Sequence, residues 1–275
     1  MTQDWQDYPA QQHTISGTVK VLADLLSPQL GNRRDLLVYL PRSYAASDQH
    51  YPVLYMHDGQ NLFDAYTSFA GEWQVDETMQ QLERDGIEWI VVGIPNAGED
   101  RLAEYSPFPD PKHGSGRGDL YLDFVVDTVK ARIDADFRTL PGRDHTGIMG
   151  SSLGGLISLY GFFSRPDVFG FAGAMSPAFW YGGRAIFPYI LKQSYVPGKI
   201  YLDAGTAEVS RRFSRWLPKH IGQPVCADAR RMYNILRRLG YQECAELRYI
   251  EEAGALHNEA AWARRLPAAL RFLLV

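Results

Sequence analysis

A serine lies between two glycines near the middle of the chain, in the sequence G-S-S-L-G at positions 150–154. The apolar segment 146–149 precedes this motif and the apolar segment 156–163 follows it, which predicts a strand, a sharp turn and a helix. Glycines beside such a turn let the strand and helix backbones approach closely, and the serine is then presented to substrate. We therefore expect Ser152 to be a nucleophile. Ser151 is the alternative nucleophile, and a turn with an ordinary helix-capping serine is the non-catalytic alternative.

A serine hydroxyl is a weak nucleophile at neutral pH and needs a general base. Where the nucleophile lies at such a strand-to-helix turn, the histidine comes later in the chain, after the last strand. His257 lies directly after the last predicted strand, 245–254. The other six histidines precede the serine or lie in predicted loops at the edge of the site. We expect His257 to be the base. Its alternative role is a surface or helix-capping residue, because Asn258 and Glu259 begin a helix.

The base in turn needs a carboxylate that fixes the imidazole tautomer and stabilises the imidazolium ion. Two candidates follow the start of the predicted strand 199–205: Asp203 within the strand end, and Glu208 three residues beyond Gly205. Glu208 begins in the loop and has one more methylene of reach, whereas Asp203 also suits a structural role near the backbone. We expect Glu208 to be the acid and keep Asp203 as the alternative.

Ester hydrolysis also needs two amide donors for the oxyanion that forms on the substrate. The residue after the nucleophile supplies one of them, which here is Leu153. The loop 57–63 follows an early strand, and we expect the second donor to be the amide of Gln60, because Gly59 lets the chain fold close to substrate. A metal site at His57 and Asp58 lacks a third ligand at suitable spacing, so we expect no metal and no organic cofactor.

Strands and helices alternate along most of the chain. Residues 14–26 and 33–41 predict an antiparallel hairpin, after which apolar runs ending in polar loops alternate with helical stretches. Such alternation predicts an α/β protein with a doubly wound, mostly parallel sheet, and one domain over 1–275. The long loops 96–118 and 206–224 follow strand ends, where we expect a rim or lid over the site. Four aromatic residues in or near such loops are candidates for substrate binding or, equally, for packing: Trp73, Trp180, Tyr181 and Trp216.

The composition limits the classes of partner. A net charge of −4 at pH 7 leaves no basic field for a phosphate backbone, so we expect no nucleic-acid partner. The apolar run 89–94 is too short to span a bilayer, and residues 1–13 lack the features of a secretory signal. We therefore predict a cytoplasmic protein with no membrane partner. Cys226 and Cys244 have no metal-ligand spacing and are expected to be unpaired thiols. The composition leaves a homo-oligomer open.

Several segments together resemble the esterase D superfamily of α/β-hydrolases: MHDGQNLFD, RLAEYSPF, IMGSSLGGLISLY, FSRPDVFGFAGAMSPAFW and GALHNEAAW. The superfamily includes enterobactin-type siderophore esterases, esterases of carbohydrate esterase family 1 and relatives of the mycolyltransferases. The resemblance covers the chain from about residue 15 onward. It implies the α/β-hydrolase fold, Ser152 as nucleophile, His257 as base and Glu208 as acid, where the family more often has aspartate.

These observations predict a serine carboxylic ester hydrolase that forms an acyl-enzyme from a short-chain, aromatic-acyl or sugar ester. A siderophore esterase, with Arg211, Arg212 and Arg215 facing a catecholate, is one alternative. Solvated loop charges are the other interpretation of that arginine run. An acyltransferase on the same serine is a second alternative, and a non-catalytic binding protein with this fold is a third.

Overall fold

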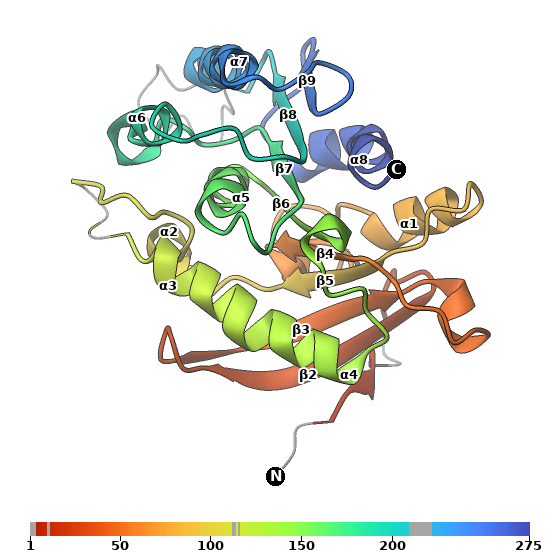
Figure 1. The fold of residues 1–275 in the computed structure, drawn as a ribbon. Coiled ribbons are helices and arrows are strands. Elements are labelled where there is room, and N and C mark those ends of the chain that lie inside the picture. The colour runs from red at the N-terminus through yellow and green to blue at the C-terminus, as the bar shows by residue number, and fades with distance from the viewer. Residues whose placement is uncertain (1–3, 10–11, 112–113, 115, 209–221) are drawn as a thin grey trace.

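The computed structural model describes residues 4–9, 12–111, 114, 116–208 and 222–275. In this part of the chain, nine strands form one sheet in the order β1-β2-β3-β5-β4-β6-β7-β8-β9, from the N-terminal strands at the bottom of Figure 1 to β9 at the top. The strands are β1 (Gln6–Asp7), β2 (Thr18–Ser27), β3 (Asn32–Leu40), β4 (Val53–His57), β5 (Ile90–Ile94), β6 (Thr146–Ser151), β7 (Phe171–Met175), β8 (Lys199–Gly205) and β9 (Leu247–Glu252).

The sheet has an antiparallel and a parallel part. Strands β1, β2, β3 and β5 pair antiparallel, and β5, β4, β6, β7, β8 and β9 pair parallel. The N-terminal hairpin and the mostly parallel sheet are therefore present as the sequence predicts. The short strand β1 was not expected, because its two residues are both exposed and carry no apolar pattern.

Helices cover both faces of the sheet (Figure 1). The helices are α1 (Val75–Glu83), α2 (Arg101–Glu104), α3 (Gly118–Asp123), α4 (Ala131–Asp136), α5 (Leu153–Ser164), α6 (Ile186–Ile190), α7 (Gly222–Leu239) and α8 (Glu259–Leu273). A π-helical segment, Phe124–Lys130, joins α3 to α4. Short 3-10 helices lie at Arg42–Ala45, Gly59–Asn61, Gly98–Asp100, Arg143–His145 and Tyr181–Arg184.

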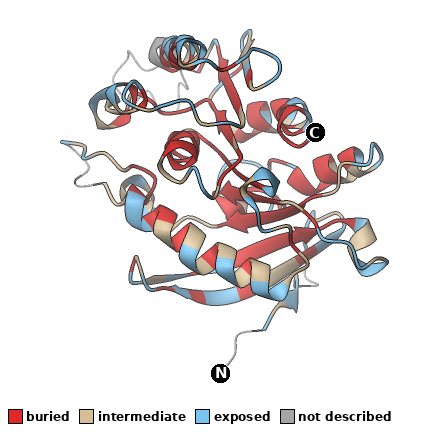
Figure 2. Ribbon diagram, in the orientation of Figure 1, coloured by how far each residue is buried: buried red, intermediate tan, exposed pale blue. Residues whose placement is uncertain are grey.

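The apolar core is divided into two main layers by the sheet, because neighbouring residues of a strand point to opposite faces. In β4, Val53 and Tyr55 belong to the layer under α3, α5, α6 and α7, whereas Leu54 and Met56 belong to the layer under α1 and α8. Strands β4 to β8 are buried along almost all of their length, whereas the edge strand β9 is buried only at Leu247, and the helices are buried on the side that faces the sheet (Figure 2). This two-sided cover explains the continuous apolar runs of the parallel strands.

Two features differ from the sequence prediction. Helix α7 begins at Gly222, inside the predicted loop 206–224, so this loop is shorter than expected, and its residues 209–221 lie outside the described residues. The predicted loop 96–118 contains α2 and folds back on itself, since Arg117 N donates to Ala103 O at 2.7 Å. In the described ranges, no helix is both long and apolar enough to cross a membrane.

Candidate active site

Ser152 occupies the turn between β6 and α5, with φ 55° and ψ −119°. A positive φ at a residue with a Cβ atom is strained, on the order of 1–3 kcal/mol, so the surroundings must hold it. They do so through the backbone: Ser152 N donates to Met175 O at 3.0 Å, and Ser152 O accepts from Ala178 N at 2.9 Å. Ser152 is half-buried, whereas the alternative Ser151 is buried at the end of β6.

The glycines of the motif allow the strand and the helix to meet. A Cβ atom on Gly150 would lie 2.9 Å from the backbone carbon of Gly154 and 2.9 Å from Cδ2 of His57. A Cβ atom on Gly154 would lie 3.3 Å from Cβ of His57. The turn after β4 therefore packs directly against the turn that carries Ser152. The two loops expected to supply oxyanion donors are thus neighbours.

His257 and Glu208 lie in contact, with Nδ1 of His257 3.0 Å from Oε2 of Glu208. The histidine side chain is partly exposed, and that of Glu208 is fully buried. The helix-capping role belongs to Asn258, whose Oδ1 accepts from Ala261 N at 3.0 Å. Burial raises the pKa of Glu208, but the hydrogen bond and charge of His257 and the bonds from Ser176 and Gly205 outweigh it, so the net shift is downward. The carboxylate form of Glu208 is therefore favoured beside His257.

Ser176 holds the other oxygen of Glu208. Its Oγ donates to Glu208 Oε1 at 2.5 Å, and the same oxygen accepts from Gly205 N at 2.5 Å. Ser176 Oγ itself accepts from Trp262 Nε1 at 3.0 Å and from Arg265 Nη2 at 2.9 Å. One buried hydroxyl thus connects the carboxylate to two side chains of α8, the helix that follows His257.

Asp203 is buried and pairs with Arg265 instead of His257. Arg265 Nε donates to Asp203 Oδ2 at 2.8 Å, and Arg265 Nη2 donates to Oδ1 at 3.1 Å. Asp203 also accepts from Ser176 N at 2.9 Å and from the hydroxyl of Tyr201 at 3.1 Å. The carboxylate of Asp203 is therefore bound by Arg265, Tyr201 and the backbone of Ser176.

The turn after β4 is fixed by the carboxylate of Asp58, a residue with φ 56°. Arg101 donates to both of its oxygens at 2.7 Å, and Asn96 Nδ2 donates to Oδ1 at 2.6 Å. Asp58 N donates to the hydroxyl of Tyr105 at 3.1 Å. A carboxylate with these partners is not a free metal ligand, which argues against a metal site at His57 and Asp58. Gln60 follows this turn, and its Oε1 accepts from Asn96 N at 3.2 Å.

His57 is buried beneath both turns. Its Nδ1 lies 2.8 Å from the hydroxyl of Tyr121, and its Nε2 has no hydrogen-bond partner in the described part of the chain. Burial lowers its pKa to about 3, with a smaller contribution from Arg101 in the same direction and an opposing one from Asp58. A neutral imidazole at this position packs against Gly150 and Gly154 without placing a charge under the site.

The predicted substrate-binding aromatics lie in different surroundings. Trp73 is buried, and its ring centroid lies 5.6 Å from that of Trp262, so it packs behind the site. Tyr181 is also buried, whereas Trp180 is half-buried and contacts it at a centroid distance of 5.9 Å. Trp216 lies outside the described residues. These positions favour packing for Trp73 and leave Trp180 as the accessible candidate among the three described.

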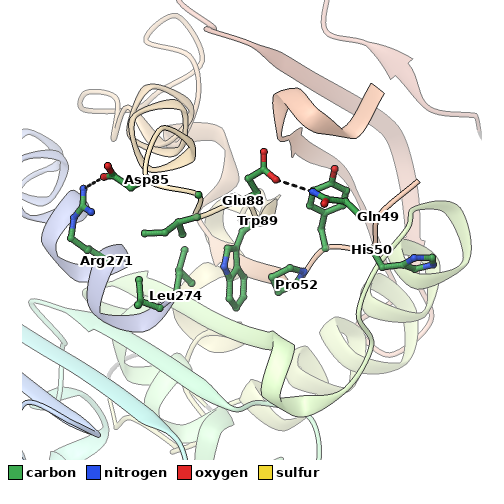
Figure 3. A pocket seen from close by; sticks show the side chains of 12 residues that line it. Gln49, His50, Pro52, Asp85, Glu88, Trp89, Arg271 and Leu274 are labelled. Atoms are coloured by element: carbon green, nitrogen blue, oxygen red, sulfur yellow. Dashed lines mark hydrogen bonds and ion pairs between the residues drawn. The ribbon is translucent and has the colours of Figure 1, made fainter. Parts of the chain in front are cut away.

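A pocket of about 780 Å³ lies elsewhere in the molecule. Its lining includes Pro52 and Trp89, which precede β4 and β5, together with Arg271 and Leu274 from the end of the chain (Figure 3). These positions mark the amino ends of the parallel strands, and ligands in such sheets bind at the carboxyl ends. We therefore do not assign this pocket to the active site.

Three residues that the structure places around the site were not expected from the sequence: Ser176, Arg265 and Arg101. Ser176 follows the strand end at β7, which is the signal that could have identified it. Arg265 lies in the middle of an amphipathic helix, where an arginine ordinarily faces solvent. No local pattern marks it as the partner of Asp203.

The fold is that of the α/β-hydrolases, and a serine at a strand-to-helix turn with a histidine bound to a carboxylate is the geometry that serine hydrolases use. The chain belongs to the Esterase family, whose model, described as "Putative esterase", matches residues 27–273. The protein is thus a carboxylic ester hydrolase, as the sequence predicts.

Individual relatives agree with this family. The uncharacterized protein YbbA of Bacillus subtilis is 27% identical over 249 residues, which cover 88% of this chain and 93% of YbbA. The siderophore triacetylfusarinine C esterase of Aspergillus fumigatus is 28% identical over 141 residues, 49% of this chain and 47% of that enzyme. Among solved structures, the siderophore hydrolase EstA of Aspergillus nidulans has a TM-score of 0.72 at 20% identity, over 91% of this chain and 94% of EstA.

Proposed function

We propose that the protein hydrolyses esters through an acyl-enzyme on Ser152. The contact between His257 Nδ1 and Glu208 Oε2 carries this proposal, because it fixes the tautomer in which Nε2 accepts a proton. Nε2 then takes the proton of the Ser152 hydroxyl as Oγ attacks the ester carbonyl carbon. The same proton passes to the alcohol oxygen as the bond between the acyl carbon and that oxygen breaks.

Water completes the reaction in the proposed mechanism. His257 Nε2 removes a proton from a water molecule as the water oxygen attacks the acyl carbon. The bond from the acyl carbon to Ser152 Oγ then breaks, and Nε2 returns the proton to Oγ. The amides of Leu153 and Gln60 stabilise the oxyanion in both steps. The packing of His57 against Gly150 and Gly154 supports this assignment, since it brings the two loops together. The residues of the site perform these steps without a metal or an organic cofactor.

The proposed substrates are small esters with short-chain, aromatic or sugar groups. A siderophore ester is the second candidate, and the observation that favours it is the similarity of the chain to a siderophore esterase and a siderophore hydrolase. Arg211, Arg212 and Arg215, which would face a catecholate, lie outside the described residues. An acyltransferase remains the alternative reaction, because an acceptor alcohol enters where water does. A non-catalytic protein is disfavoured, since all three side chains of the proposed triad are present.

We also propose a cytoplasmic location. One observation supports it: Cys226 and Cys244 are both free thiols in the structure, as is usual in a reducing compartment.

The test of the proposed function is a panel of chromogenic esters of graded acyl length, run beside feruloyl, acetyl-sugar and catecholate esters. We expect one class to be hydrolysed by the wild type, and Ser152→Ala to lower kcat by roughly 10⁶ with the fold retained. Ser151→Ala is the matched control and should keep most of the activity. A fluorophosphonate probe should label Ser152. Turnover above a few per cent in a clean Ser152→Ala preparation would exclude Ser152 as nucleophile, and acyl transfer to a sugar in water would identify a transferase.

A further inference from the structure

Three acidic side chains converge beside the start of α1, apart from the proposed triad. Glu72, Asp76 and Glu77 each have a carboxylate oxygen within 4.8 Å of those of the other two. Glu72 precedes the helix, and the other two lie in its first turn. Asp76 is 0% exposed, and Glu72 and Glu77 are half-buried. Three carboxylates so close together repel one another unless protons or a cation neutralise them.

One oxygen of each carboxylate lacks a hydrogen-bond donor. Glu72 Oε1, Asp76 Oδ1 and Glu77 Oε2 are inaccessible to solvent and have no partner in the described part of the chain. The second oxygens of two of them are held: Asp76 Oδ2 accepts from Ser16 N at 2.6 Å, and Glu72 Oε2 accepts from Thr14 Oγ1 at 3.1 Å. Buried charged oxygens without partners are costly, so their presence in one place points to a missing positive group.

The described residues supply no such group. In the ranges that the structure covers, no lysine, arginine or histidine forms an ion pair with these three carboxylates.

We propose that Glu72, Asp76 and Glu77 bind a divalent cation, with Ca²⁺ as the expected ion. Carboxylate oxygens are hard ligands that Ca²⁺ and Mg²⁺ prefer over softer metals. Ca²⁺ accepts irregular arrangements of oxygen ligands, whereas Mg²⁺ requires near-ideal octahedral geometry and retains several water molecules. The carboxylate oxygens of the cluster lie within 4.8 Å of one another, a separation that one Ca²⁺ ion with bonds of about 2.4 Å can span. Water molecules would complete the coordination, because each residue offers one unbonded oxygen.

The position of the cluster suggests a structural role for the cation. Thr14 and Ser16 belong to the N-terminal segment, so the ion would join this segment to α1 through Glu72 and Asp76. Glu72 also precedes Trp73, whose ring packs on Trp262 at 5.6 Å, and Trp262 in turn lies 5.1 Å from His257. The cation therefore fixes the wall behind the proposed base. It takes no part in the proposed reaction, and the proposal does not depend on that reaction.

The test is thermal unfolding of the full chain after dialysis against EDTA, at pH 7.5 and without substrate. Samples contain no metal, 5 mM Ca²⁺ or 5 mM Mg²⁺, and calorimetric titration with CaCl₂ measures binding directly. We expect Ca²⁺ at about a hundredfold excess over its Kd to raise the Tm by about 5 °C and Mg²⁺ to raise it less. Asp76→Asn and Glu77→Gln should abolish both the shift and the heat of binding.

Asp85→Asn is the matched control, because Asp85 lies just beyond α1 and pairs with Arg271 instead of the cluster. This variant should keep the full calcium response. Should Asp76→Asn fail to fold, Glu77→Gln and the titration of the wild type decide the question. A wild type that shows neither a Tm shift nor binding heat at millimolar Ca²⁺ contradicts the proposal. An equal shift in all variants contradicts it too, since the ion would then act elsewhere.

Discussion

Arg265 binds the carboxylate of Asp203 through two nitrogens, Nε to Oδ2 at 2.8 Å and Nη2 to Oδ1 at 3.1 Å. Both side chains are buried, so the carboxylate of Asp203 is already bound in this ion pair. Glu208, five residues further along, is then the carboxylate that contacts His257. We therefore expect the loss of Glu208 to affect catalysis and the loss of Asp203 to affect stability.

Glu208→Gln should lower kcat by roughly 10³ to 10⁴ with little change in Tm, because the amide no longer fixes the productive imidazole tautomer. Asp203→Asn should mainly lower the free energy of unfolding, by roughly 3 kcal/mol, because Arg265 loses the charge of its buried partner. Steady-state kinetics and urea unfolding of both variants measure the two effects. The assignment is wrong if Asp203→Asn loses activity like a triad variant while its stability is unchanged.

Ser176→Ala tests the hydroxyl that supports Glu208. The substitution removes one donor to Glu208 Oε1 and leaves Trp262 Nε1 and Arg265 Nη2 with one acceptor fewer. We expect kcat to fall roughly tenfold at an unchanged KM, and the free energy of unfolding to fall by roughly 2 kcal/mol. Ser158→Ala is the control, because this buried serine bonds only to Gly154 O among the described contacts. Equal kinetics for both variants would show that Ser176 has a purely structural role.

Because His57 is buried, we expect the free energy of unfolding to fall in acid. Burial lowers its pKa in the folded state to about 3, below the value of about 6.5 in the unfolded chain. The unfolded state therefore binds a proton first, so stability is complete above about pH 6.5 and is lost as the pH falls toward 3. This proton contributes a slope of about 1.4 kcal/mol per pH unit within that window. Urea unfolding at several pH values should show a shallower slope for His57→Gln. The exposed His145→Gln should keep the slope of the wild type, and three equal slopes would contradict the prediction.

The substitution Gly59→Ala tests the role of the loop that carries the proposed oxyanion donor. A Cβ atom at this position would lie 2.6 Å from the backbone carbon of Gly93, so alanine must push the loop away from β5. We expect Gly59→Ala to lower kcat by roughly 10² with a smaller effect on KM, as the loss of one oxyanion donor does. Gly142→Ala is the control, since it is exposed, has φ −69° and has no atom within 4 Å of the added carbon. Unchanged kcat in folded Gly59→Ala would remove Gln60 from the proposed oxyanion hole.

The sequence by itself determined the alternation of strands and helices along the chain, the mostly parallel sheet with its N-terminal hairpin, and the choice of the proposed nucleophile and base. These predictions rest on local features, because the period of the apolar residues and the glycines around Ser152 directly determine which backbone conformation forms. The contact partners of a residue are not local. Glu208 and Asp203 lie near the end of β8 with similar chemistry, and the sequence favoured Glu208 as the acid. That Asp203 pairs with Arg265 on α8, 62 residues further along the chain, could not be predicted from the sequence.

The tertiary structure also decided which polar groups support the site and which remain without partners. Ser176, Arg101 and His57 meet the site from separate elements, so no spacing in the sequence predicts their contacts. The same holds for the cluster of Glu72, Asp76 and Glu77. In the sequence it is an ordinary group of acidic residues at the start of a helix. Only the structure shows that Ser16 and Thr14 pack against it. Burial changes a common sequence pattern into a candidate cation site, because only a buried carboxylate must find a partner.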